Sequence, residues 1–151
     1  IIMKDRFRLV CASYLIIRKG NQILLHLRQN SGFMDGFYSL VSGHLDGDES
    51  FSQCMVREAK EEAGIDVEVE DLTCVYVGNR CEQKNPVPIK ERVDVYFEVA
   101  KWEGEIANME PENCAGLEWF DFDNLPENII PYVKNDLINI KNKKFYSETG
   151  Y

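Results

Sequence analysis

The segment from Ser50 to Ala63 constrains the fold of this chain more than any other, because it specifies a helix with a start, an inner face and an end. Ser50 followed three residues later by Gln53 has the pattern of a capping box, which satisfies exposed amides at a helix start. Apolar residues recur at helical spacing and predict a buried stripe: Phe51, Met55, Ala59 and Ala63. Gly64 is the residue type that most readily takes the left-handed conformation of a helix end. The chain is therefore expected to fold around this amphipathic helix.

Three glutamates lie on one face of the predicted helix. Glu58, Glu61 and Glu62 follow one another at helical spacing, which places their carboxylates on adjacent positions. Like charges in this arrangement repel, and hard oxygen ligands on a rigid face suit Mg²⁺ or Mn²⁺. The alternative is a solvated acidic face that pairs with Arg57 or Lys60. The glutamates taken alone favour that alternative, and the sequence around them reverses the preference.

Apolar alternation and turn residues divide the rest of the chain into strands and one further helix. The expected strands are 9–18, 22–28, 37–41, 67–79, 92–102 and 117–121. Lys19-Gly20-Asn21 predicts a turn that joins the first two strands in a hairpin, and Pro86 and Pro88 predict a stiff loop. A closing helix is expected from Tyr132 to Lys141. One helix between strands and another at the end indicate an α/β architecture with a mixed sheet.

The chain from Gly43 to Ile65 resembles the Nudix box. That pattern is Gly, five residues, Glu, seven residues, Arg-Glu, an apolar residue, any residue, Glu-Glu, any residue, Gly and an apolar residue. Every defined position is filled here, by Gly43, Glu49, Arg57, Glu58, Ala59, Glu61, Glu62, Gly64 and Ile65. Average residue usage gives such a match by chance with a probability on the order of 10⁻⁹ per register. One departure is Val41-Ser42-Gly43, where many members have Pro-Gly-Gly.

The resemblance implies one Nudix domain over residues 1–151, folded as an α/β/α sandwich with a mixed β-sheet. It also implies a pyrophosphohydrolase, a hydrolase acting on acid anhydrides, which cleaves a diphosphate linkage in a nucleoside diphosphate derivative. The implied cofactor is Mg²⁺ or Mn²⁺, which stabilises charge on phosphate oxygens and lowers the pKa of a coordinated water. The expected metal ligands are the carbonyl of Gly43 and the carboxylates of Glu58, Glu61 and Glu62.

The expected catalytic roles fall on a few residues of this motif and of a later loop. Arg57 is expected to orient one of the glutamates, because a planar guanidinium can bind a carboxylate through two hydrogen bonds. Glu61 is the first choice as general base. Glu110 and Glu112 are the alternatives, since residues 102–113 resemble an acidic loop from which some members draw the base. A solvated acidic turn explains this segment equally well.

Substrate binding needs positive groups for phosphate and flat groups for a base. Arg28 ends an expected strand where many Nudix proteins have an arginine, so it is a candidate for binding phosphate. Aromatic candidates for stacking on a base, which in strands are more often core residues, are Phe33, Phe37, Tyr38 and Trp119. A positive concentration that could steer an anion, or simply be solvated, is formed by Arg80, Lys84, Lys90 and Arg92.

The end of the chain favours one subclass of substrate. Trp119-Phe120 followed by Leu125-Pro126 is similar to the tail of members that hydrolyse nucleoside triphosphates. A house-cleaning nucleoside triphosphate pyrophosphohydrolase is therefore the preferred function. Dinucleoside polyphosphates and nucleotide sugars are alternative substrates, since the same metal centre serves them. A non-catalytic nucleotide-binding regulatory module is the alternative from another class, and the intact glutamates disfavour it.

Composition narrows the expected partners to a small-molecule nucleotide. A net charge of −9 opposes binding through phosphate neutralisation, so a long nucleic acid is not expected as a partner. The apolar runs are too short to cross a bilayer and the first residues do not resemble a signal peptide, so a cytoplasmic protein with no membrane partner is expected. The five scattered cysteines are expected to be free thiols, and His26 and His44 are not expected to bind metal. A homodimer is left open.

Overall fold

The computed structural model describes residues 4–82 and 91–151. The helices are α1 (Phe51–Ala63), the short 3₁₀ turn η1 (Val69–Asp71) and α2 (Pro131–Lys141). The strands are β1 (Val10–Ile16), β2 (Arg18–Lys19), β3 (Gln22–Arg28), β4 (Tyr38–Ser39), β5 (Val41–His44), β6 (Leu72–Cys81), β7 (Glu91–Val99), β8 (Cys114–Asp121) and β9 (Tyr146–Thr149). The predicted proline loop with Pro86 and Pro88, and the predicted cations Lys84 and Lys90, lie outside the described residues.

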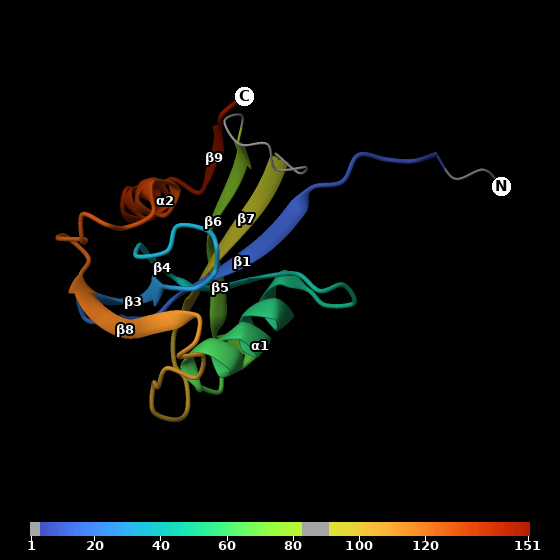
Figure 1. Cartoon of the computed structure of the whole chain (residues 1–151). Coiled ribbons are helices and arrows are strands. Elements are labelled where there is room, and N and C mark those ends of the chain that lie inside the picture. The colour runs from blue at the N-terminus through green and yellow to red at the C-terminus, as the bar shows by residue number, and fades with distance from the viewer. Residues whose placement is uncertain (1–3, 83–90) are drawn as a thin grey trace.

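The strands form two sheets (Figure 1). The larger has five strands in the order β5-β1-β7-β6-β9 and is mixed, because the β1–β7 and β6–β9 pairs are parallel while the others are antiparallel. The smaller has four strands, with β3 at its centre between β8 on one side and β2 and β4 on the other, all antiparallel.

The two long helices cover opposite faces of the larger sheet. Successive residues of a strand point to opposite faces of its sheet. On one face, Tyr14 and Ile16 of β1 pack with Val133 and Leu137 of α2. Leu15 packs instead with the α1 stripe on the other face. Figure 1 shows this layering, with α1 and α2 on either side of the strands. The predicted α/β/α sandwich with a mixed sheet is therefore confirmed.

Helix α1 has the start and end that the sequence predicts. The Ser50 side chain accepts a hydrogen bond from the Gln53 amide, and the Gln53 side chain accepts one from the Ser50 amide, which completes the capping box. Gly64 ends the helix in the left-handed region with φ 71°. Met55, Ala59 and Ala63 of the predicted stripe are 0% exposed. This helix can be predicted because its signals are all local.

The predicted first hairpin is only partly correct. Residues 12–17 are buried on both faces, which is typical of a central strand between two layers. β1 accordingly lies between β5 and β7, and only β2 forms the hairpin with β3. The predicted strand 37–41 likewise divides into β4 and β5, which belong to different sheets. Strand β9 is not predicted at all, since it is an edge strand in which only Ser147 is buried.

No helix within residues 4–82 and 91–151 has both the length and the apolar character needed to span a bilayer.

Candidate active site

The site is built where α1 crosses the end of β5. Gly43, on β5, faces Glu58 on the helix, and a Cβ atom at Gly43 would lie 2.0 Å from Oε1 of Glu58. A side chain at position 43 would therefore displace this carboxylate. Gly43 is predicted from the sequence to offer its carbonyl to a cation, and the packing adds a second role, because its missing side chain makes room for Glu58.

Arg57 connects the carboxylates of this region. Its Nε and Nη2 donate to both oxygens of Glu49 at 3.1 and 2.8 Å, and its Nη1 donates to Glu58 at 2.6 Å. The same Nη1 lies 3.2 Å from Glu61. Hydrogen bonding from Arg57 lowers the pKa of Glu49 to about 2. Arg57 was predicted to orient one of the three glutamates, and the structure places its guanidinium against two of them, Glu58 and Glu61.

Among the three helix glutamates, Glu58, Glu61 and Glu62, the carboxyl group of Glu62 is the most shielded from water. Burial raises its pKa to about 8, and the charges of Glu58 and Glu110 act in the same direction. The hydrogen bond that opposes this shift is donated by the backbone amide of Ser42 at 2.9 Å. Burial also raises the pKa of Glu58 to about 6, against the opposing effect of Arg57. Two neighbouring carboxyl groups are therefore held where a negative charge is costly.

The acidic loop (residues 102–113) brings Glu110 to this cluster. The loop packs on the end of α1 through hydrogen bonds from Ala107 and Met109 amides to the carbonyls of Ala63 and Glu62, at 3.0 and 3.2 Å. The charge of Glu110 raises the pKa values of both Glu58 and Glu62. Of the two candidates in this loop, the structure brings Glu110 and not Glu112 to the helix. Glu112 is exposed, and its carbonyl accepts a hydrogen bond from Asn30.

The donor set fits a hard divalent cation. As the side chains stand, no three His, Cys, Asp or Glu residues within 4–82 and 91–151 form a ready metal cluster. The carboxylates are turned to different partners, Glu58 and Glu61 to Arg57 and Glu62 to the Ser42 amide. A cation near Glu58 and Glu62 would nevertheless favour their charged forms, which burial disfavours. Carboxylate oxygens are also the ligands that Mg²⁺ and Mn²⁺ prefer.

Arg28 lies beside this cluster, at the end of β3. Its positive charge slightly opposes the rise that burial causes in the pKa of Glu62. Its Nε donates to the carbonyl of Phe33 at 2.8 Å, and its guanidinium lies 5.6 Å from the centre of the Phe33 ring. Phe37 is partly buried and packs against the core, and its carbonyl accepts a hydrogen bond from the Arg28 amide at 3.0 Å. Phe33, 40% exposed, is the residue whose ring lies near the Arg28 guanidinium.

Trp119 is placed away from Arg28. It packs with the core on the α1 side of the sheet, and the ammonium of Lys19 lies 4.8 Å above its ring. Trp119 and Lys19 line a separate cavity of about 550 Å³, which Trp102 also lines. The structure therefore does not bring Trp119 together with Arg28 and Phe37 in one binding surface.

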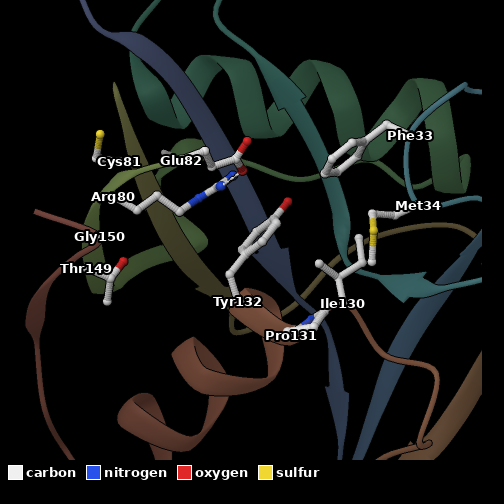
Figure 2. A pocket seen from close by; sticks show the side chains of 10 residues that line it. All are labelled: Phe33, Met34, Arg80, Cys81, Glu82, Ile130, Pro131, Tyr132, Thr149 and Gly150. Carbon is white, nitrogen blue, oxygen red and sulfur yellow. Dashed lines mark hydrogen bonds and ion pairs between the residues drawn. The ribbon is translucent and has the colours of Figure 1, made fainter. Parts of the chain in front are cut away.

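A larger cavity of about 740 Å³ lies between the β3–β4 loop and the start of α2 (Figure 2). It is lined by Phe33, Met34, Arg80, Cys81, Glu82, Ile130, Pro131, Tyr132, Thr149 and Gly150. The Arg80 guanidinium lies 3.7 Å from the Tyr132 ring centre, and the Tyr132 hydroxyl is 3.1 Å from that of Tyr14. Tyr132 could not be predicted as a cavity residue from the sequence, because the cavity joins the start of α2 to segments far away in the chain, among them the loop that carries Phe33.

The predicted anion-steering arginines are paired with acidic groups. Arg80 donates to Asp94 at 2.7 Å and Arg92 lies 3.3 Å from the same carboxylate. Asp94 is fully buried and the Arg80 side chain is 8% exposed. Arg80 is therefore not a solvated loop charge, and its pairing with Asp94 leaves it poorly suited to steer an anion. It lines the large cavity instead.

Comparison with known proteins places the site in a family context. A sequence model of the NUDIX domain matches residues 7–142. The NAD-capped RNA hydrolase NudC of Pseudomonas aeruginosa is 34% identical over 119 residues, which are 79% of this chain and 38% of that protein. NudC of Pseudomonas entomophila is 32% identical over 112 residues, 74% of this chain and 36% of that protein. This chain thus spans little more than a third of the length of these relatives.

Solved structures agree in fold. The MutT NUDIX hydrolase of Burkholderia pseudomallei superposes with a TM-score of 0.77 at 24% identity, covering 87% of this chain and 98% of that one. The MutT protein of Methanosarcina mazei gives a TM-score of 0.74 at 18% identity, covering 89% and 94%. At these identities the likeness concerns the fold alone.

Proposed function

This chain belongs to the NUDIX family, and from that premise we propose that it hydrolyses a diphosphate linkage in a nucleotide derivative with the help of a divalent cation. The observation that carries the proposal is the pair of partly buried carboxyl groups of Glu58 and Glu62, both under the charge of Glu110, with Gly43 leaving space for Glu58. Like charges are gathered there at a cost in stability, and a cation would offset that cost.

The proposed metal ligands are the carboxylates of Glu58, Glu61 and Glu62 and the carbonyl of Gly43, with Glu110 added from the acidic loop. When bound, Mg²⁺ or Mn²⁺ supplies positive charge that stabilises the developing charge on the phosphate oxygens. In this proposal Arg57 orients Glu58 through the hydrogen bond of 2.6 Å that it donates. The same nitrogen also donates to Glu61 at 3.2 Å.

Glu61 remains the proposed general base, because its side chain is 50% exposed and can reach a water molecule at the open side of the helix. Glu110 replaces Glu112 as the alternative base. The reason is its location, since the charge of Glu110 acts on both Glu58 and Glu62 whereas the Glu112 side chain is exposed.

The proposed substrate lies with its phosphates toward α1 and its flat group in the large cavity. Arg28 is the proposed phosphate contact, because its charge already acts on Glu62. Phe33 and Tyr132 line the cavity and are proposed to contact a ring of the substrate. Phe37 supports this region from the core, and Trp119 leaves the proposed substrate contacts because it lines another cavity.

Two substrate classes are proposed, each on a separate observation. The tail of the sequence favours a nucleoside triphosphate. The two relatives at 32% and 34% identity are named NAD-capped RNA hydrolases, which favours the diphosphate of a dinucleotide. The net charge of −9 opposes strong binding of an RNA chain beyond its cap, so free dinucleotides are the better second candidate.

The test is product release from nucleoside triphosphates, free and RNA-linked dinucleotides, dinucleoside polyphosphates and nucleotide sugars, with Mg²⁺, Mn²⁺ or chelator. We expect metal-dependent turnover of at least one class. Glu62→Gln, which keeps the shape of the side chain but not its charge, should lower kcat by about 10³ to 10⁴, or roughly 4 to 5.5 kcal/mol. Turnover that survives both the chelator and this substitution would disprove the metal assignment. If the folded protein released no product from any of these substrates, a nucleotide-binding module would be favoured.

A further inference from the structure

Three side-chain amides hold the last part of the acidic loop. Each donates a hydrogen bond to a backbone carbonyl, Asn108 to Cys114 at 2.8 Å, Gln29 to Pro111 at 2.6 Å and Asn30 to Glu112 at 2.8 Å. Such bonds order a loop that would otherwise have many conformations. The segment that carries Glu110 is therefore fixed from two sides, by its own Asn108 and by the loop after β3.

The backbone of Glu110 is held at both its polar groups. Its amide donates to Oδ1 of Asn108 at 3.1 Å. Its carbonyl accepts from the amides of Asn113 and Cys114 at 2.9 and 2.8 Å. The backbone of Glu110 is therefore preorganised, and rotation about the side-chain bonds is the main freedom left to its carboxylate.

Asn108 lies at the centre of this arrangement. The residues on either side of it, Ala107 and Met109, both bond to the end of α1. Its side chain then joins Glu110 to Cys114, the first residue of β8. Asn108 therefore lies between the end of α1 and Glu110, and both the oxygen and the NH2 group of its side-chain amide form hydrogen bonds.

We propose that Asn108 is a positioning residue that sets the carboxylate of Glu110 against those of Glu58 and Glu62. Gln29 extends the arrangement to the substrate side, because its backbone amide donates to Asn113 at 3.1 Å and it follows Arg28 in the chain. The proposal rests on the proposed function, since it assigns Asn108 to the same metal-dependent site, but it concerns the placement of Glu110 and not the identity of the substrate.

The test compares substitutions at Asn108 with Glu110→Gln. Asn108→Ala removes both hydrogen bonds, and Asn108→Ser keeps a hydroxyl that can still accept from the amide of Glu110. We expect Asn108→Ala to lower kcat and Mn²⁺ affinity by about 10- to 100-fold with KM little changed, as for residues that orient metal ligands. Asn108→Ser should recover part of both losses. Mn²⁺ binding is measured by calorimetry on the folded protein without substrate.

The decisive variant combines Asn108→Ala with Glu110→Gln. If Asn108 acts through Glu110, the double variant should be no worse than Glu110→Gln alone, because the two residues then form one unit. Losses that add, or Asn108→Ala with unchanged kcat and Mn²⁺ affinity, would overturn the proposal. The control is Asn21→Ala, which loses side-chain bonds to Asp121 and Asp123 at the β2–β3 turn and should leave both quantities unchanged.

The same measurements separate this proposal from the proposed function. Turnover by the unmodified protein with no effect of Glu110→Gln would overturn the role of Asn108 and leave the function standing. Mn²⁺ binding that depends on Glu110 and Asn108 without turnover of any substrate would support the positioning role and overturn the hydrolase. Neither turnover nor Mn²⁺ binding by folded protein would overturn both.

Discussion

At the scale of single residues, the clearest constraint is the space shared by Gly43 and Glu58. A Cβ atom at position 43 would lie 2.0 Å from Oε1 and 2.2 Å from Cδ of Glu58. We expect Gly43→Ala to displace this carboxylate and lower kcat by about 10- to 100-fold, the usual cost of disturbing a ligand's surroundings. The fold should persist, because the displaced atoms belong to a side chain. Steady-state kinetics and a thermal melt of the same sample check both parts.

A matched control for this substitution is Gly116→Ala. A Cβ atom there would first meet Glu118 Oε1 at 4.0 Å, which is an ordinary contact, and Gly116 does not have a positive φ. Its kinetics and melting temperature should match those of the unmodified protein. A Gly43→Ala protein with full activity would show that Glu58 is not needed in its observed position.

At the scale of elements, α1 carries the helix carboxylates of the site and its start depends on Ser50. The hydroxyl of Ser50 accepts from the Gln53 amide at 3.1 Å. We expect Ser50→Ala to lower the free energy of unfolding by about 1 kcal/mol, the usual cost of losing an N-cap. The control is Ser52→Ala at the second residue of the helix, which should be neutral or slightly stabilising because alanine favours helices. Urea unfolding compares the two, and equal values would contradict the capping role.

What the sequence could predict follows from the range of the interactions involved. The boundaries of α1 and its glutamates are encoded by residues within one or two turns of each other, and the structure has them as predicted. The prediction of the first hairpin was partly wrong, because β1 pairs with β5 and β7 and no local sequence pattern specifies these partners. The choice of Glu110 over Glu112, and the single cavity that both Phe33 and Tyr132 line, likewise depend on segments that come together only in the folded chain.

At the scale of the whole molecule, a buried carboxyl group joins α2 to the larger sheet. Asp136 of α2 accepts hydrogen bonds from Tyr76 of β6 and Tyr96 of β7 at 2.9 and 2.6 Å. Burial raises the pKa of Asp136 from 3.8 to about 6, although these hydrogen bonds oppose the shift. The folded protein therefore holds this proton more tightly than the unfolded chain, so the stability that Asp136 contributes is complete below about pH 4 and declines toward pH 6.

The last prediction tests this decline with Asp136→Asn, which keeps the shape of the group and one acceptor oxygen but cannot ionise. Urea unfolding of both proteins from pH 4 to pH 7 gives the difference in their free energies of unfolding. Glu58 and Glu62 also titrate in this range with the same sign, and they cancel in the difference because both proteins contain them. The unmodified protein should lose on the order of 1 to 3 kcal/mol relative to Asp136→Asn as the pH rises. A difference that is constant with pH would mean that Asp136 is ionised throughout, and that the two tyrosine hydroxyls stabilise its charge enough to offset burial.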